Sequence, residues 1–170
     1  MTMANDWSIK VISRGMGIFR QAAEQLVQEM RRRIQTVENL VAKAVSRPGL
    51  FFQIGVSPIV SVGTNTFIHE LIVRAGARNL AEGNTAYPRF SKEQVLEMSP
   101  DIIIITSMAR ADVFEKIKAD WYQWTNLPAV KNDRIYFQDS NLFNRPSPRL
   151  VDALEILVRL VHPEMFEEDS

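Results

Sequence analysis

The segment Tyr87–Ile105 concentrates residues that could contact a ligand or a partner. Ser91 is followed three residues later by Gln94, the spacing of a capping box, so a helix is predicted to begin here and to end at Ser99-Pro100. Glu93 falls in the first turn, where the positive end of the helix dipole stabilises an exposed carboxylate. An aromatic loop, a capped helix and an apolar strand follow one another, and the loop carries the groups able to meet a ligand.

Enzyme chemistry has few candidates in this sequence. Asp139 closes a predicted strand, at the end where open α/β sheets bind ligands, but a lone aspartate is more often a turn former than a catalyst. The two histidines, His69 and His162, lack a metal-ligand spacing. The sequence contains no glycine-rich phosphate loop and no GxSxG elbow. We therefore expect no resident cofactor, no metal site and no specific acid-base pair.

The composition is that of one ordinary globular lobe of 170 residues, with 46% hydrophobic and 24% charged residues. Lysine plus arginine equals aspartate plus glutamate, at 20 each, which argues against a nucleic-acid partner. The absence of cysteine excludes disulfides and thiolate chemistry. The tail 1–17 has no apolar run of signal-peptide length, and no segment reaches the length of a membrane span, so we expect no export signal in the chain as written.

A long amphipathic helix is predicted over residues 18–46, because apolar residues recur at helical spacing on one face. The basic run Arg31–Arg33 within it is interpreted as a solvated face, interleaved with glutamates, rather than as a nucleic-acid patch. Pro48 and Gly49 then end the helix.

The rest of the chain alternates strands and helices, which predicts an α/β fold: a three-layer sandwich with a mostly parallel sheet. The unbroken β-branched run in 102–106 is typical of a parallel strand covered on both faces. The other predicted strands are 50–54 and 134–138, and 58–62 is either a further strand or an extended loop segment. The other predicted helices begin at an N-cap of Thr64 or Asn65 and end at Ala75 before Gly76, run from Asp112 to Ala119 before an aromatic cluster (Trp121, Tyr122 and Trp124), and run from a Ser147-Pro148 cap to Val161.

Read in order, eight segments resemble the substrate-binding proteins of ABC importers for ferric siderophores, haem and vitamin B12. They are 15–18 (GMGI), 51–54 (FFQI), 62–68 (VGTNTFI), 75–79 (AGARN), 87–96 (YP followed by SKEQVL), 99–104 (SPDIII), 127–136 (LPAVKNDRIY) and 145–150 (RPSPRL). In that family two α/β lobes are joined by one long helix, and the ligand lies between the lobes. The resemblance implies an N-terminal tail (1–17), the connecting helix (18–46) and the C-terminal substrate-binding lobe (50–166), without the N-terminal lobe.

The resemblance also implies roles for single residues. Tyr87 stands where the vitamin B12 binder has an aromatic that packs on the ligand, and Glu93 matches the glutamate that docks on arginines of the permease. Arg145 and Asn141 match cleft positions, and the first strand-to-helix loop adds weaker candidates, Thr64, Asn65 and Phe67. Each of the first two residues has another interpretation that stays open. Tyr87 could be an aromatic that anchors its own loop, and Glu93 could be a helix-dipole carboxylate without a partner.

The function that the resemblance implies is a non-catalytic receptor that passes a ferric siderophore-type chelate to an ABC permease, with vitamin B12 or haem as the alternative ligand. The full-length protein is expected to be periplasmic, or membrane-anchored on the outer side. The siderophore is favoured slightly, because we expect no second aromatic for a flat corrin. One alternative of another class is a small α/β enzyme that uses Asp139 and Arg145. A further one is a structural domain that forms a homodimer through the uncovered stripe of the long helix.

Overall fold

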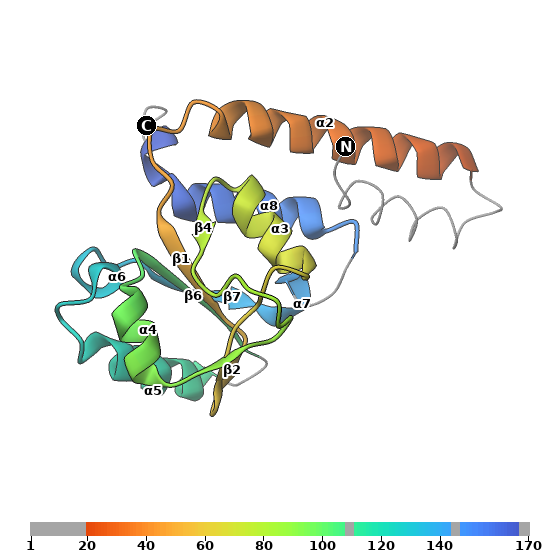
Figure 1. Cartoon of the computed structure of the whole chain (residues 1–170). Coiled ribbons are helices and arrows are strands. Elements are labelled where there is room, and N and C mark those ends of the chain that lie inside the picture. Colours follow the sequence, from red (N-terminus) through yellow and green to blue (C-terminus); the bar gives the residue numbers. More distant parts are fainter. Residues whose placement is uncertain (1–19, 108–110, 144–146, 167–170) are drawn as a thin grey trace.

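The computed structural model of the protein describes residues 20–107, 111–143 and 147–166 (Figure 1). Its helices and strands, in chain order, are α2 (Arg20–Val41), β1 (Gly49–Gln53), β2 (Gly55–Val56), β3 (Ile59–Val60), α3 (Phe67–Arg74), β4 (Arg78–Asn79), β5 (Arg89–Phe90), α4 (Lys92–Met98), β6 (Ile102–Ser107), α5 (Ala111–Tyr122), α6 (Pro128–Lys131), β7 (Ile135–Asp139), α7 (Ser140–Phe143), α8 (Leu150–Val161) and a 3-10 turn (Pro163–Met165).

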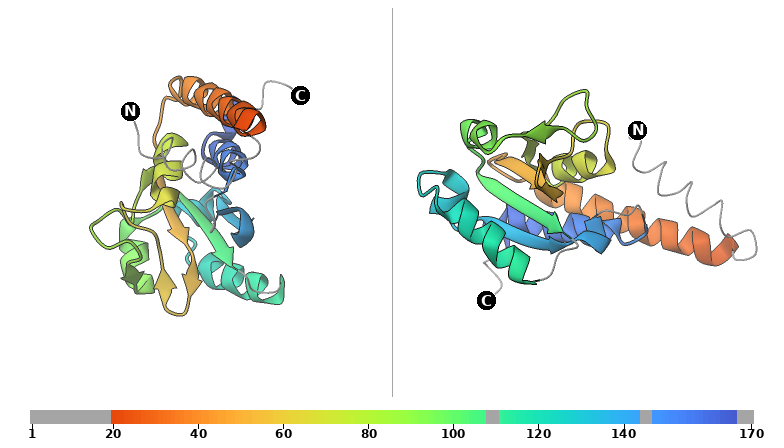
Figure 2. Two further views of the ribbon diagram at one scale, coloured as in Figure 1. Left: turned by 90° about the vertical axis from the view of Figure 1, so that its right-hand side faces the viewer. Right: turned by 90° about the horizontal axis from the view of Figure 1, so that it is seen from below.

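The central sheet is parallel and has the strand order β4-β1-β6-β7. Phe51 of β1 pairs with Ile103 of β6, which in turn pairs with Ile135 of β7. Helices cover both faces, with α2, α3 and α8 on one side and α4 and α5 on the other (Figures 1 and 2). The predicted three-layer α/β fold with a mostly parallel sheet is confirmed.

Two hydrophobic cores lie on opposite faces of this sheet, because successive strand side chains point in opposite directions. Phe52 and Ile104 pack toward α3 and α8, whereas Phe51 and Ile103 pack toward α4 and α5. All four side chains are buried completely. An apolar run without polar alternation is thus explained by burial on both sides, as expected for β6.

Helix α2 packs along α8 and α3 with the stripe of apolar residues that the periodicity predicted. It ends at Val41, earlier than the predicted end at 46, in a turn closed by a hydrogen bond from the Lys43 N–H to the Leu40 carbonyl, 3.0 Å. The interpretation of the basic run as a solvated face is wrong for Arg33. Its guanidinium makes ion pairs with Asp152 and Glu155 of α8, at 2.7 and 2.6 Å.

The boundaries of three further elements differ from the sequence prediction. Helix α3 is capped by Thr66, whose hydroxyl accepts a hydrogen bond from the His69 N–H at 3.2 Å, rather than by Thr64 or Asn65. Helix α5 continues past the predicted end at Ala119, includes the first two residues of the aromatic cluster and ends at Tyr122. Helix α8 begins at Leu150, without a side-chain cap, rather than just after Ser147.

The second predicted strand, 58–62, is reduced to the two residues of β3, which belong to a separate antiparallel sheet of order β2-β3-β5. Other local predictions are confirmed. Ser91 and Gln94 form the capping box of α4 in both directions, and Gly76 takes a positive φ of 81° at the end of α3. In the part of the chain that the structure describes, no helix combines the length and apolar character needed to cross a bilayer.

Candidate functional site

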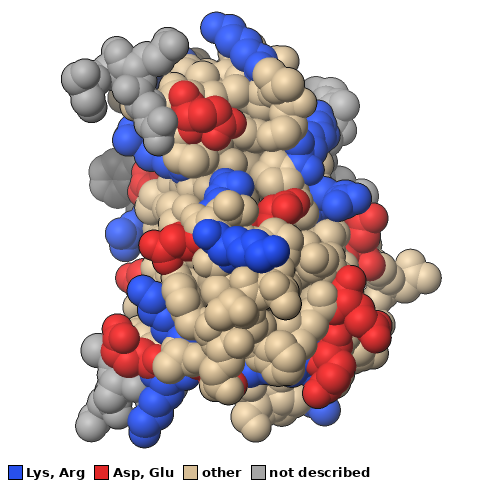
Figure 3. Space-filling view, turned by 90° about the vertical axis from the view of Figure 1, so that its left-hand side faces the viewer, with Lys and Arg blue, Asp and Glu red and all other residues tan. Residues whose placement is uncertain are grey.

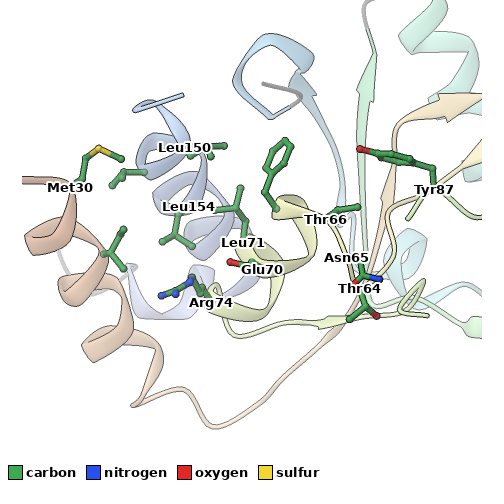
Figure 4. Close-up of a pocket in the computed structure, with 13 residues that line it drawn as sticks. Met30, Thr64, Asn65, Thr66, Glu70, Leu71, Arg74, Tyr87, Leu150 and Leu154 are labelled. Carbon is green, nitrogen blue, oxygen red and sulfur yellow. The ribbon is translucent and has the colours of Figure 1, made fainter. Parts of the chain in front are cut away.

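A pocket of about 430 Å³ opens between α2, α3 and α8 and extends to the loop that carries Tyr87 (Figure 4). Four of the residues predicted from the sequence line it: Thr64, Asn65, Phe67 and Tyr87. They come from two segments about 20 positions apart, so the fold rather than the local sequence brings them together. The other lining residues are Met30, Ile34, Thr66, Glu70, Leu71, Arg74, Leu150, Val151 and Leu154.

Backbone pairing fixes the first of the two segments against the second. The Gly63 N–H donates to the carbonyl of Ala86 at 2.8 Å, and a Cβ at Gly63 would lie 1.9 Å from the carbonyl oxygen of Thr85. Only glycine therefore allows this close approach. The Thr64 hydroxyl accepts a hydrogen bond from the Gly83 N–H at 2.9 Å. These contacts hold the start of the α3 loop beside the segment that leads to Tyr87.

Tyr87 itself is 56% exposed and lies at the rim of the pocket (Figure 4). The carbonyl of the next residue, Pro88, accepts a hydrogen bond from the Ser61 N–H at 3.0 Å, which anchors the loop without burying the ring. A ring that is held at its backbone and exposed at its face can pack on a ligand while its hydroxyl stays in water.

The part of the inner end that α2 and α8 form is apolar, and it was missed at the sequence level. Met30 of α2 lies opposite Leu150 and Leu154 of α8 (Figure 4). Ile34 of α2 also lines the pocket. The periodic stripe on the long helix identified such residues as inward-facing, but nothing local distinguishes a side chain that fills a core from one that borders a cavity. That distinction depends on the gap between two helices more than 100 residues apart in sequence.

Two charged side chains of α3 also line the pocket in the described part of the chain. Arg74 makes an ion pair with Glu38 of α2. One carboxylate oxygen of Glu70, Oε2, is buried without a hydrogen-bond partner. Buried polar atoms of this kind are uncommon in folded proteins, and each has an energetic cost until it finds a donor.

Of the last two predicted ligand contacts, Asn141 lies apart from this group, and the other falls outside the described part of the chain. Asn141 is exposed, does not line the pocket, and donates from its backbone N–H and its side-chain Nδ2 to Asp139 Oδ1, at 2.8 and 3.1 Å. Asp139 thereby closes the turn into α7, the turn-forming role that its sequence context favoured. Arg145, the predicted cationic contact, lies outside the described residues.

Glu93, the predicted docking residue, is exposed in the first turn of α4 and does not line the pocket. Hydrogen bonds from its own N–H and from the Ser91 side chain, with the nearby Lys92 charge, lower the pKa of Glu93 below the ordinary glutamate value. Acidic and basic side chains are interspersed on the face seen in Figure 3, on the side of the molecule where α4, α5 and α6 lie. Glu93 is therefore an ionised carboxylate with a defined direction, available to a cationic partner.

The histidines have local structural roles. His69 Nδ1 lies 3.0 Å from the amide of Asn79, and that amide also donates to the carbonyl of Val62 at 2.8 Å. His162 is buried at the end of α8, with Nδ1 3.2 Å from Glu164 Oε1. The described residues contain no group of three or more potential metal ligands.

A comparison with protein families identifies the fold and the class. The family described as periplasmic binding protein matches residues 20–142. The chain belongs to this family. Its members are substrate-binding proteins of transport systems, not enzymes, which argues against the enzyme alternative with Asp139 and Arg145.

Two relatives of known sequence are similar to this chain over most of its length. An uncharacterized ABC transporter substrate-binding lipoprotein, YvrC, of Bacillus subtilis is 29% identical over 165 residues, 95% of this chain and 51% of that protein. A vitamin B12-binding protein of Vibrio parahaemolyticus is 31% identical over 106 residues, 61% of this chain and 37% of that protein. The chain thus spans about half the length of these relatives or less.

Solved structures share the same fold. A possible iron-binding periplasmic solute-binding protein of Staphylococcus epidermidis superimposes with a TM-score of 0.80 at 24% identity, covering 95% of this chain and 64% of the other. The vitamin B12-binding protein BtuF of Vibrio cholerae gives a TM-score of 0.80 at 23% identity, covering 99% and 65%. At this identity the likeness concerns the fold alone.

Proposed function

We propose that this chain is the C-terminal lobe, with its connecting helix, of the substrate-binding component of an ABC importer, and that it binds a ferric siderophore-type chelate. The observation that supports this most is the pocket: Thr64, Asn65, Phe67 and Tyr87, assigned to ligand contact from the sequence, line one cavity. Its apolar walls with a few polar groups at the rim are typical of a small-molecule site.

A corrinoid is the second candidate ligand, and one observation supports it directly. Phe67 is only partly buried and lines the same pocket as Tyr87. A second aromatic ring is therefore available for a flat ligand, which the sequence alone did not lead us to expect. Haem would be bound by the same two rings. Relatives named for vitamin B12 binding are in keeping with this alternative.

The ligand role of Tyr87 can be tested by Tyr87→Ala. Loss of the ring should weaken binding of the cognate chelate or corrinoid by about tenfold, because the ligand loses one packed face. Titration followed by tryptophan fluorescence or calorimetry measures the dissociation constant. Tyr136, partly buried on β7 and absent from the pocket lining, offers a matched control as Tyr136→Phe. An unchanged constant for Tyr87→Ala would remove this residue from the site.

We further propose that Glu93 docks the protein on arginines of the permease, outside the cytoplasmic membrane. The proposal is supported by the exposure of Glu93, its lowered pKa and its fixed place in the first turn of α4. Charge reversal by Glu93→Arg should abolish ligand uptake by cells that carry the permease and leave ligand affinity unchanged. Glu97→Arg, an exposed acid near the other end of the same helix, is the matched control. Normal uptake with Glu93→Arg would exclude the docking role.

A further inference from the structure

The charges at the inner end of the pocket carry information about the ligand. Among the described residues that line the pocket, the basic side chain is Arg74 and the acidic one is Glu70. The positive charge of Arg74 is matched by Glu38, which reaches it from α2 as an ion pair. The three groups together therefore carry one net negative charge.

The Glu70 carboxylate lies at this inner end, on the side of α3 that faces α2 (Figure 4). Its Oε2 atom has no hydrogen-bond partner and is shielded from solvent. Two of the neighbouring wall residues are the leucines Leu71 and Leu154. In such surroundings a charge is screened less than at an open surface, so the negative potential extends into the cavity.

The groups at the outer end are neutral. Asn65 is exposed, and its amide can both donate and accept hydrogen bonds. Thr66 is already engaged, because its hydroxyl donates to the Gly63 carbonyl at 2.8 Å. The Thr64 hydroxyl accepts from the Gly83 N–H and keeps its own proton to donate. This end therefore offers neutral hydrogen-bonding groups and adds no charge to the pocket.

Resting on the function proposed above, we infer that the pocket selects ligands without net negative charge, with Glu70 as the residue that sets this preference. Hydroxamate chelates of iron and corrinoids are neutral or cationic, whereas tris-catecholate chelates of iron and haem carry negative charge. The cargo therefore belongs to the first pair of classes. An anionic ligand would have to approach the Glu70 carboxylate and the net negative charge of the Glu70, Arg74 and Glu38 group, which costs binding free energy.

Two series of probes that differ only in charge test this inference on the 170-residue chain. The first uses one ferric trihydroxamate, ferrioxamine B, with its terminal amine free (cationic), acetylated (neutral) or succinylated (anionic). The second compares cyanocobalamin with its monocarboxylic acid, in which one amide is replaced by a carboxylate. We expect the cationic or neutral member to bind about tenfold more tightly than the anionic member of the same series.

Two substitutions assign the preference to the proposed charges. Glu70→Gln removes one negative charge with little change of shape and should reduce the preference to about threefold or less. Glu38→Gln removes the other carboxylate next to Arg74 and should shift selectivity in the same direction. Glu97→Gln, on the opposite side of the sheet, is the control and should leave the ratio unchanged. Thermal unfolding of each variant shows whether it folds like the parent chain.

The possible outcomes distinguish a failure of the charge preference from a failure of the proposed receptor function. If the anionic member of a series binds as tightly as its neutral partner, the charge inference is overturned and the receptor function stands. If the preference exists but survives both Glu70→Gln and Glu38→Gln, these carboxylates are not its source and the inference is wrong. If no member of either series binds, the proposed ligand classes fail, and the inference fails with them.

Discussion

The helix layers on the two faces of the central sheet differ in how completely they are packed. On the α4–α5 face the core is closed: Trp121 is 1% exposed, and its indole N–H donates to Gln53 Oε1 at 3.2 Å. On the α3–α8 face, helix α2 leaves a cavity of about 430 Å³ against α3 and α8. The closed face stabilises the fold, and the open face retains apolar surface that a ligand or a partner can cover.

The polar side chains of the two faces also differ in whether they have partners. On the closed face, Lys92 pairs with Asp120 and lies over the ring of Trp121, and the Tyr122 hydroxyl donates to Asp133. On the open face, Glu70 Oε2 stays buried without a partner beside the cavity. Unsatisfied polar atoms in native proteins often mark sites where something else binds. The proposed ligand site lies on the open face, and the contrast between the two faces predicts unequal responses to mutation.

The largest expected effect is on the closed face. Trp121→Ala should lower the free energy of unfolding by about 3–5 kcal/mol, because it leaves a cavity among well-packed neighbours and removes the donor to Gln53. Chemical denaturation measures this change. Trp124→Ala, at an exposed ring three residues further along the chain, should change stability by less than about 0.5 kcal/mol. Similar losses for the two tryptophans would contradict a closed core on this face.

Two substitutions of isoleucine by the larger phenylalanine, one on each face, compare the faces directly. Ile117→Phe on the closed face should destabilise the protein by about 1–3 kcal/mol, since the added ring has no space. Ile34→Phe borders the cavity and should change stability by less than about 0.5 kcal/mol, while it weakens ligand binding. Denaturation and ligand titration measure the two effects. Equal destabilisation would mean that the cavity is not available space.

The ion pairs that join α2 to the open face should have a smaller effect. Arg33→Met removes the contacts to Asp152 and Glu155, and we expect a loss of about 1 kcal/mol, because all three side chains are partly exposed. Hydrogen exchange should increase in α2 and remain unchanged in β6. The matched control is Arg32→Met, which breaks an exposed pair with Glu29 within the same helix. A loss for Arg32→Met as large as for Arg33→Met would contradict a specific link between the helices.

The smallest expected effect is a pH dependence on the closed face. Desolvation and the hydrogen bond to Asp133 raise the pKa of Tyr122 to about 12. A raised pKa means that the neutral phenol contributes stability below its unfolded value of about 10, and that this contribution is lost as the pH rises through about 12. Tyr122→Phe should remove that part of the alkaline decrease, as followed by thermal unfolding between these pH values. An identical alkaline profile for the variant would exclude Tyr122 as its source.

Local patterns in the sequence determined most of the secondary structure. The spacing of Ser91 and Gln94 defined the start of α4, and the run of isoleucines in β6 identified a strand buried on both faces. These signals are local, since a capping box involves four residues and a run of consecutive apolar side chains indicates a strand buried on both faces. Errors occurred where competing caps stood close together, as with Thr64, Asn65 and Thr66, because only the backbone conformation decides which hydroxyl faces the helix end.

The candidate site, too, was predicted from the sequence only in part. The sequence by itself predicted Tyr87 and Phe67 as ligand contacts, because the order of segments along the chain carries the resemblance to the family, and both residues line the pocket. Only the tertiary structure decided the rest: that Arg33 joins two helices, that Glu70 borders a cavity, and that Asn141 lies apart from it. The physical reason is that a cavity and a long-range ion pair are properties of the space between elements, and that space is set by how distant segments pack.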